Sequence, residues 1–264
     1  MNSLDRTWRL WIVAALAATV LGLGVLSFVI VPLVGAQTAG LGAFAAICRA
    51  VGINLGGAAQ IGSAAGPPAT RLAWTGTEFA ALAHADRAAG EALAQASCVA
   101  CHAADGTSAD PSIPRMSGQS AFAIYKELQD FKSGARTNET MSPVAEPLDP
   151  KQMAEVAAYY AGLRRTDLDP AHPSFAGPEI ETLVAAGDAA RALPPCAACH
   201  APGAGGPIET PSLTGQSPTY VTQQLEAFAS GGRHNDVFQR MRSIAAKLAP
   251  REMNLLGAYY TTPH

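Results

Sequence analysis

Two short segments of this chain carry the same pattern of reactive side chains, Cys-x-x-Cys-His. The pattern residues are Cys98, Cys101 and His102 in the first copy and Cys196, Cys199 and His200 in the second. Two cysteines three positions apart lie on one helical turn, where their sulfur atoms can form thioethers with the vinyl groups on one edge of a haem. The histidine that follows can direct a ring nitrogen at the iron. The sequence therefore predicts two covalently attached c-type haems, with iron bound by His102 and His200.

Cysteine and histidine also build zinc sites, and four cysteines in an exported protein can form a disulfide framework. These alternatives fit the residue types, but a histidine directly after the second cysteine is typical of haem attachment. No other Cys or His stands at zinc-ligand spacing around either motif. The fifth cysteine, Cys48, is interpreted as a small buried residue, with a lipid attachment site or an intermolecular disulfide as alternatives.

The region around the motifs is duplicated. Residues 114–120 return as residues 211–217, at an offset of 97 positions, and residues 141–160 match residues 241–260 at an offset of 100. A three-residue insertion in the second copy accounts for the change of offset. The sequence therefore predicts two copies of one supersecondary unit, each of fewer than about 100 residues.

A second axial ligand decides whether a haem iron transfers electrons or binds small molecules. Met141 and Met241 stand at matched positions of the repeat, well after the motif histidine of each copy and just before its last predicted helix. A Met/His ligand pair raises the reduction potential and closes the iron to other ligands. Met141 and Met241 are therefore predicted to complete the two iron sites.

The other methionines and histidines are weaker ligand candidates. Met116 is unmatched, since Leu213 stands in its place in the second copy. Met153 and Met253 are matched, but they fall within predicted helices and are interpreted as core residues. Among the remaining histidines, which have no counterpart across the repeat, His234 is the reserve ligand.

Prolines and tyrosines recur near the predicted haem sites. Pro114 and Pro211 follow the two motif histidines at nearly the same spacing in each copy. A carbonyl oxygen at that point could accept the second N–H of the imidazole and fix its orientation, and a plain turn proline is the alternative. The paired tyrosines are predicted to pack in the core, with haem contact as the alternative. These are Tyr159, Tyr160, Tyr259 and Tyr260.

Helices must position these residues. In the first copy, apolar residues recur at helical spacing over residues 85–96, 120–132 and 150–163, and the last of these begins with a proline. No strand-like alternation competes with this pattern, so the fold class is predicted to be all-α.

The N-terminal segment carries a targeting signal. Arg6 and Arg9 precede an uncharged stretch whose most apolar part, residues 10–34, is 25 residues long. A helix of about 20 residues crosses a bilayer core, and flanking arginines keep that end in the cytoplasm. The sequence therefore predicts a single-pass protein of the bacterial inner membrane with its haem domains in the periplasm. A cleaved signal peptide is the alternative.

The two copies resemble a known family. CVACH, PRMSG, MSPVA and YY in the first copy, and CAACH, PSLTG, MRSIA and YY in the second, resemble the class I cytochromes c, and their tandem arrangement resembles the di-haem cytochrome c-four type. The resemblance covers about residues 83–264 and implies two packed cytochrome c folds. It implies His/Met ligation at His102/Met141 and His200/Met241, with carbonyl acceptors at Pro114 and Pro211. The chain departs from the family type in the part that precedes the two copies.

The predicted organisation follows from these features. Residues 1–9 form a cytoplasmic N-terminus, 10–34 the transmembrane anchor, and 35–78 a tether rich in Gly and Ala. The first cytochrome c domain spans residues 79–166, a linker spans 167–177, and the second domain spans 178–264.

The predicted function is electron transfer, without a catalytic residue. The expected partners are a quinol-oxidising complex, quinol–cytochrome c oxidoreductase, as donor and a haem-copper oxidase as acceptor. A formal net charge of -3 and the lack of a Lys/Arg-rich run exclude nucleic acid as a partner. The alternatives are the cytochrome subunit of a membrane dehydrogenase and a di-haem peroxidase, and methionines at both predicted irons argue against the peroxidase.

Overall fold

A computed structural model of the protein describes residues 3–25, 70, 72–164, 176–201 and 206–261. The chain divides into two compact units, Met1–Gly66 and Pro67–His264. Its regular secondary structure in the described ranges is helical, apart from an isolated bridge between Asp188 and Leu193. The all-α prediction is confirmed for these ranges.

The first unit contributes one described helix, α1 (Ser3–Val25). Of the predicted anchor, the stretch from Leu10 to Val25 lies in this helix. Residues 26–34 lie outside the described residues, as do Cys48 and the predicted tether as far as residue 69. Among the described helices none is long and apolar enough to cross a membrane. The predicted transmembrane helix is therefore not supported here.

The first repeat forms helices whose ends are set by local capping. Asp86 accepts hydrogen bonds from two backbone N–H groups at the start of α5, and Ser120 accepts one at the start of α7. Asp149 and Gln152 form a capping box at the start of α9, where Pro150 occupies the first turn. The helices are α4 (Gly76–Ala83), α5 (Arg87–Ser97), α6 (Val99–His102), α7 (Ala121–Ser133), α8 (Met141–Ala145) and α9 (Pro150–Ala161).

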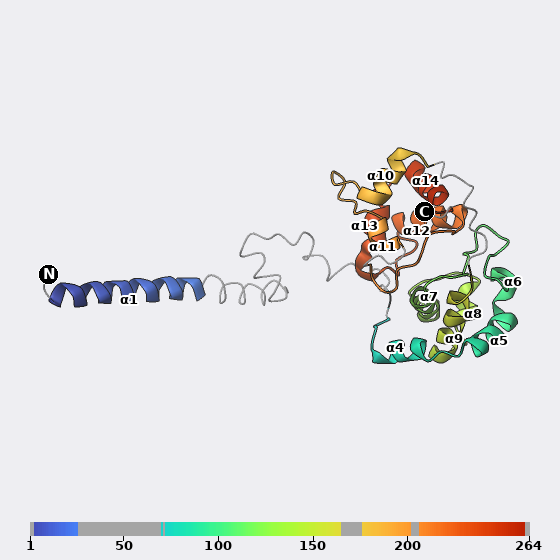
Figure 1. Ribbon diagram of the computed structural model, residues 1–264, viewed down its shortest axis with the longest axis horizontal. Coiled ribbons are helices and arrows are strands. Elements are labelled where there is room, and N and C mark those ends of the chain that lie inside the picture. Colours follow the sequence, from blue (N-terminus) through green and yellow to red (C-terminus); the bar gives the residue numbers. More distant parts are fainter. Residues whose placement is uncertain (1–2, 26–69, 71, 165–175, 202–205, 262–264) are drawn as a thin grey trace. The chain divides into compact units, whose positions relative to one another are not determined.

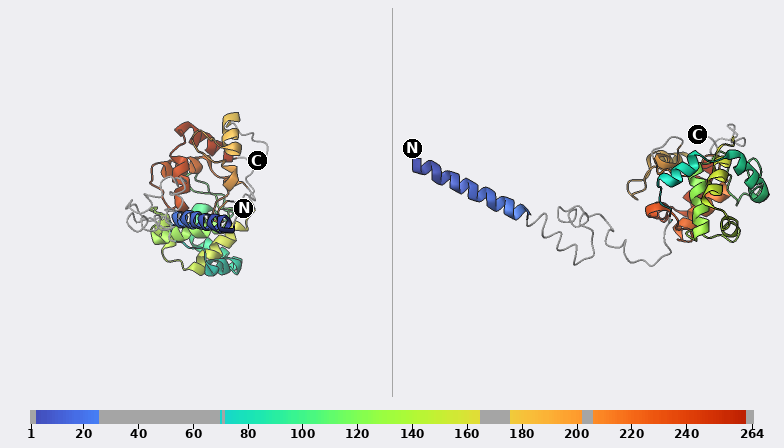
Figure 2. Two further views of the ribbon diagram at one scale, coloured as in Figure 1. Left: turned by 90° about the vertical axis from the view of Figure 1, so that its left-hand side faces the viewer. Right: turned by 90° about the horizontal axis from the view of Figure 1, so that it is seen from below.

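The second repeat reproduces the order from α5 to α9 and adds a short 3-10 helix, η3. Prolines stand in the first turns of its three longer helices, where the missing N–H costs no hydrogen bond. Figures 1 and 2 show the helices of the two repeats as two neighbouring groups, cyan to yellow-green and yellow-orange to red. The elements are α10 (Pro178–Ala186), α11 (Ala197–His200), α12 (Pro218–Ala229), η3 (Val237–Gln239), α13 (Arg240–Ala245) and α14 (Pro250–Tyr260).

Each repeat has its own hydrophobic core. In the first repeat α5 crosses α9 so closely that a Cβ at Gly90 would lie 2.0 Å from the carbonyl oxygen of Glu155. In the second repeat, a Cβ at Gly257 of α14 would lie 2.6 Å from a carbonyl oxygen of α12. Leu72 and Trp74 pack against the first core, so this core includes residues that the sequence assigned to the tether.

Charged side chains lie between the two repeats. Glu127 of α7 accepts hydrogen bonds from Arg136 of its own repeat and forms an ion pair with Arg233 of the second, at 2.6 and 2.9 Å. Gln224 accepts from both arginines, at 2.8 and 2.9 Å. We call the set the interdomain cluster; it consists of Lys126, Glu127, Asp130, Arg136, Gln224, Arg233 and Asn235. The cluster joins the two repeats by side chains that water reaches poorly.

Candidate functional site

Each Cys-x-x-Cys-His motif forms a single helical turn, α6 in the first repeat and α11 in the second. The His102 N–H donates to the Cys98 carbonyl at 3.0 Å, and the His200 N–H donates to the Cys196 carbonyl at 2.9 Å. None of the four motif cysteines forms a disulfide within the described part of the chain. Burial raises the pKa of the Cys98 thiol to about 11. Two thiols on one turn are placed as covalent haem attachment requires.

The two motif histidines have the same orientation relative to their loops. Nδ1 of His102 lies 3.1 Å from the Pro114 carbonyl oxygen, and Nδ1 of His200 lies 2.9 Å from that of Pro211. Burial lowers the pKa of both imidazoles, although the carbonyl contacts oppose this change. Because a carbonyl can only accept, Nδ1 carries the hydrogen and Nε2 of the neutral ring keeps a lone pair. Each ring is therefore ready to bind a metal through Nε2.

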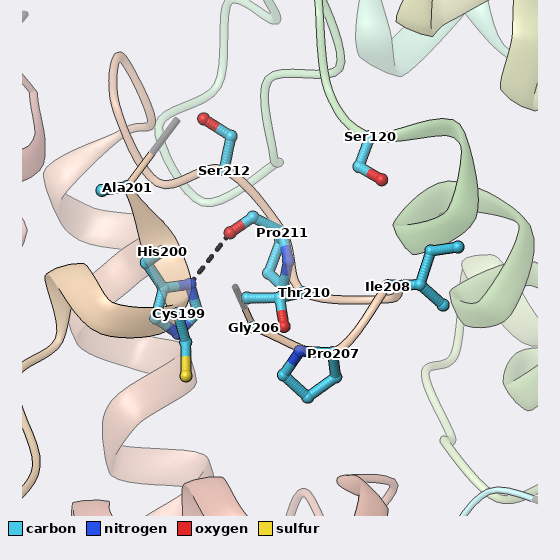
Figure 3. Close-up of a pocket in the computed structure, with 10 residues that line it drawn as sticks. All are labelled: Ser120, Cys199, His200, Ala201, Gly206, Pro207, Ile208, Thr210, Pro211 and Ser212. Atoms are coloured by element: carbon cyan, nitrogen blue, oxygen red, sulfur yellow. Dashed lines mark hydrogen bonds between the residues drawn. The ribbon is translucent and has the colours of Figure 1, made fainter. Parts of the chain in front are cut away.

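A cavity of about 410 Å³ lies beside His200. Figure 3 shows the dashed contact between His200 and Pro211, and it shows Ser120, from the ribbon of the first repeat, opposite Ile208. Residues of both repeats thus line the cavity. Its volume lies within the usual range of about 300–1,000 Å³ for cofactor sites.

Matched tyrosine hydroxyls are buried near the motifs. The Tyr160 hydroxyl has no hydrogen-bond partner within the described part of the chain, whereas the Tyr260 hydroxyl interacts with Cys196. Burial raises the pKa of both tyrosines. The Tyr160 ring centroid lies 6.4 Å from that of His102. Tyr159 instead donates to the Ala104 carbonyl at 2.7 Å. Two cysteines on one turn and an Nε2 available for a metal, at matched positions of the two repeats, fit a covalently held haem in each repeat.

The described methionines lie either against a hydrophobic core or inside one. Met141 begins α8 and packs against the first core with Cys98, and Met241 packs against the second core with Cys196. Met116 also contacts the first core. The matched methionines of α9 and α14 are 0% and 5% exposed and are core residues, as predicted. The structure thus brings each predicted methionine ligand and its motif to one core.

The histidines outside the motifs are weak candidates for iron ligands. His234 is partly buried, and its Nε2 has no hydrogen-bond partner in the described ranges. His84 ends α4, whereas His172 and His264 lie outside the described residues. Over the described ranges, no group of three or more His, Cys, Asp or Glu side chains could hold a metal ion. The zinc alternative therefore finds no support in these ranges.

Two glutamines, which the sequence pattern did not mark as functional, lie next to the loops that contain Pro114 and Pro211. Gln119 and Gln216 are 8% and 6% exposed, and each bonds the backbone of the other repeat. Arg136 and Arg233 were also matched across the repeat but not assigned. The signal was present, since a polar residue kept at a matched position of both copies is a candidate for a contact between them.

Comparison with known proteins places the chain in a family. The family model "Cytochrome c" matches residues 87–163. Cytochrome c4 of Pseudomonas aeruginosa is 39% identical over 189 residues, which cover 69% of this chain and 92% of that protein. The thiosulfate dehydrogenase electron acceptor of Thiomonas intermedia is 36% identical, over 62% of this chain and 77% of its own length.

A solved structure shows the same fold. The crystal structure of reduced recombinant cytochrome c4 from Pseudomonas stutzeri matches with a TM-score of 0.61 and 31% identity, and the match covers 68% of this chain and 100% of that one. The relatives and the family model agree with the motif geometry, so the protein binds c-type haem covalently, two per chain, and transfers electrons. The chain belongs to the cytochrome c4 family of di-haem class I cytochromes c.

Proposed function

We propose that this protein carries electrons in a periplasmic respiratory chain, from a quinol-oxidising complex, quinol–cytochrome c oxidoreductase, to a haem-copper terminal oxidase. One observation carries the proposal: each repeat holds its motif histidine by the same Nδ1-to-proline-carbonyl contact, at 3.1 and 2.9 Å. Two matched sites within one compact unit are suited to a carrier that gains and loses electrons without changing shape.

The chain's own residues have separate tasks in this proposal. Cys98 and Cys101 would hold one haem by thioethers, His102 would bind its iron through Nε2, and Met141 would supply the second protein ligand. Cys196, Cys199, His200 and Met241 would do the same in the second repeat. When bound, the haem iron supplies reversible one-electron chemistry. The Pro114 and Pro211 carbonyls hold the rings in one tautomer and orientation.

Optical spectra test the ligand assignment. We expect two covalent haems per chain, a methionine-to-iron band in the oxidised protein, and no change of the reduced spectrum under carbon monoxide. Rapid mixing with the purified quinol-oxidising complex and then with the oxidase tests the partners. Reduction and reoxidation faster than turnover of the respiratory chain are expected. A haem that binds carbon monoxide, or an exchange slower than turnover, would contradict the proposal.

A second candidate is the cytochrome subunit or direct electron acceptor of a dehydrogenase. It is favoured by the 36% identity to the thiosulfate dehydrogenase electron acceptor. The discriminating measurement compares the rates at which a purified thiosulfate dehydrogenase and the quinol-oxidising complex reduce the protein. A faster reaction with the dehydrogenase, together with copurification of the two proteins, would replace the respiratory assignment.

We also propose that the haem domains lie on the periplasmic face of the inner membrane, attached through residues 10–34. The support is the 25-residue apolar stretch in the sequence. Carbonate extraction of membranes should leave the full-length protein in the pellet and release a variant that lacks residues 1–36 behind a cleavable export signal. Release of the full-length protein would refute the attachment.

A further inference from the structure

Two matched glutamines form crossed contacts between the repeats. The Gln216 side chain accepts from the Arg115 N–H at 2.8 Å and donates to the Arg115 carbonyl at 3.0 Å. The Gln119 side chain does the same with Ser212, at 2.8 and 2.9 Å. Arg115 and Ser212 are themselves matched residues. Each glutamine thus binds the loop of the opposite repeat through two hydrogen bonds.

These loops are the ones that hold the haem histidines. The N–H of Arg115 belongs to the same peptide group as the Pro114 carbonyl, which lies 3.1 Å from Nδ1 of His102. The N–H of Ser212 likewise belongs to the peptide group of the Pro211 carbonyl, 2.9 Å from Nδ1 of His200. One peptide group therefore contacts a histidine at its oxygen and a glutamine of the other repeat at its nitrogen.

The glutamine amides are held firmly. Each Oε1 also accepts the N–H of the following serine, at 3.0 Å for Ser217 and 2.8 Å for Ser120, so both of its lone pairs are used. Both glutamine side chains are buried, and a buried amide whose oxygen accepts two hydrogen bonds and whose nitrogen donates one has little freedom to move. The contact is therefore a fixed part of the histidine's surroundings.

We propose that each glutamine is a positioning residue for the haem histidine of the opposite repeat: Gln216 acts on His102, and Gln119 acts on His200. The inference rests on the proposed ligation of iron by these histidines. A hydrogen bond to the N–H of a peptide polarises its carbonyl and strengthens the bond that this carbonyl accepts. A stronger Nδ1–H···O bond makes the imidazole a more basic ligand, which favours oxidised iron and lowers the reduction potential.

Replacing each glutamine by leucine in the full-length holoprotein tests the inference. Gln216→Leu should raise the potential of the haem attached to Cys98, by about threefold in its oxidised-to-reduced ratio, or ~30 mV at 59 mV per tenfold. The other haem should not change. Gln119→Leu should raise the potential of the haem attached to Cys196 and leave that of the haem attached to Cys98 unchanged. The two potentials are resolved by redox titration followed through haem methyl NMR signals, assigned to each haem by their contacts with its own motif.

A second readout reports on the histidine itself. In the reduced protein, the Nδ1–H NMR signal of His102 should move upfield and exchange faster with solvent in Gln216→Leu, and that of His200 should not. Ser217→Ala is the matched control, because it removes the hydrogen bond to the Pro111 carbonyl across the same interface and the cap bond from the Tyr220 N–H, without touching either peptide. Both potentials should stay unchanged in this control.

Different outcomes would overturn the role of the glutamines and the proposed electron-transfer function. A shift in the glutamine's own repeat, equal shifts in both haems, shifts in Ser217→Ala of the same size, or no shift at all would overturn the inference while the spectra of both haems stay normal. Loss of covalent haem or of histidine ligation in the unmodified protein would instead overturn the proposed function.

Discussion

The interdomain cluster allows a stability prediction for Glu127→Gln. Glu127 faces Lys126, Arg136 and Arg233 at 2.9, 2.6 and 2.9 Å. Burial alone would raise the pKa of Glu127, but these three cations hold it well below its usual range. In the variant Lys126 keeps its ion pair with Asp130, but Arg136 and Arg233 lose the carboxylate that they share. Removing one member of a buried ion pair costs about 3–5 kcal/mol.

The lower end of that range is expected, since the Glu127 side chain is 24% exposed and glutamine can still accept a hydrogen bond. Urea unfolding of the holoprotein at neutral pH should therefore show a loss of about 3 kcal/mol in the free energy of unfolding. Glu179→Gln is the matched control, because Glu179 pairs with Arg251 at 3.8 Å on the surface, where the side chains are 68% and 78% exposed. The control should lose less than about 1 kcal/mol. Equal losses in the two variants would refute the reasoning.

Single substitutions test other parts of the molecule. Met141→Ala should open one haem to carbon monoxide while Met116→Ala should not, as difference spectra of the reduced variants will show. Gly90→Ala should destabilise the holoprotein by about 1–3 kcal/mol in urea unfolding, because its Cβ would lie 2.0 Å from a backbone carbonyl oxygen of α9. Hydrogen bonding to Arg191 lowers the pKa of Glu252 from its usual 4.5. The destabilisation caused by Arg191→Met should therefore be largest above pH 4.5 and should shrink as the pH falls through the lowered pKa. Unfolding curves from about pH 3 to pH 7 check this, and a loss that does not depend on pH would contradict it.

The sequence predicted the helices and motifs because their signals are local. A histidine directly after a cysteine pair, a proline at a helix start and a capping residue all act within a few positions of the chain. The predicted helix over residues 120–132 differs from α7 by one residue at each end. Such features require no knowledge of the tertiary structure.

Contacts between distant segments were not predictable in the same way. The Gly/Ala-rich composition before residue 79 indicates a tether, yet Trp74 lies against Phe122 with ring centroids 5.4 Å apart and donates to Glu209 of the second repeat at 3.2 Å. Trp74 contributes to this packing together with Leu72, and Phe122 and Glu209 lie far from Trp74 in the sequence. Composition averages over a segment and misses such a residue.

The same reasoning explains why the interface was missed although the repeat was found. Matching the two copies shows which residues are shared, but a contact such as that of Gln216 with Arg115 depends on how one copy faces the other. Because each glutamine meets the other's loop, the interface follows a pseudo-twofold arrangement, and only such an arrangement lets one matched residue serve both sites.

That pseudo-symmetry is broken in charge. Lys126, Glu127 and Asp130 of α7 stand where the second repeat has Gln223, Gln224 and Ala227, so this helix carries three charged residues in the first repeat and none at the matched positions of the second. Partly buried charges are screened less by salt than exposed ones. Two haems with the same proposed ligand set therefore meet different electrostatic surroundings, and unequal potentials are expected even though the two folds repeat each other. A difference of this origin would give electrons a preferred direction between the two irons.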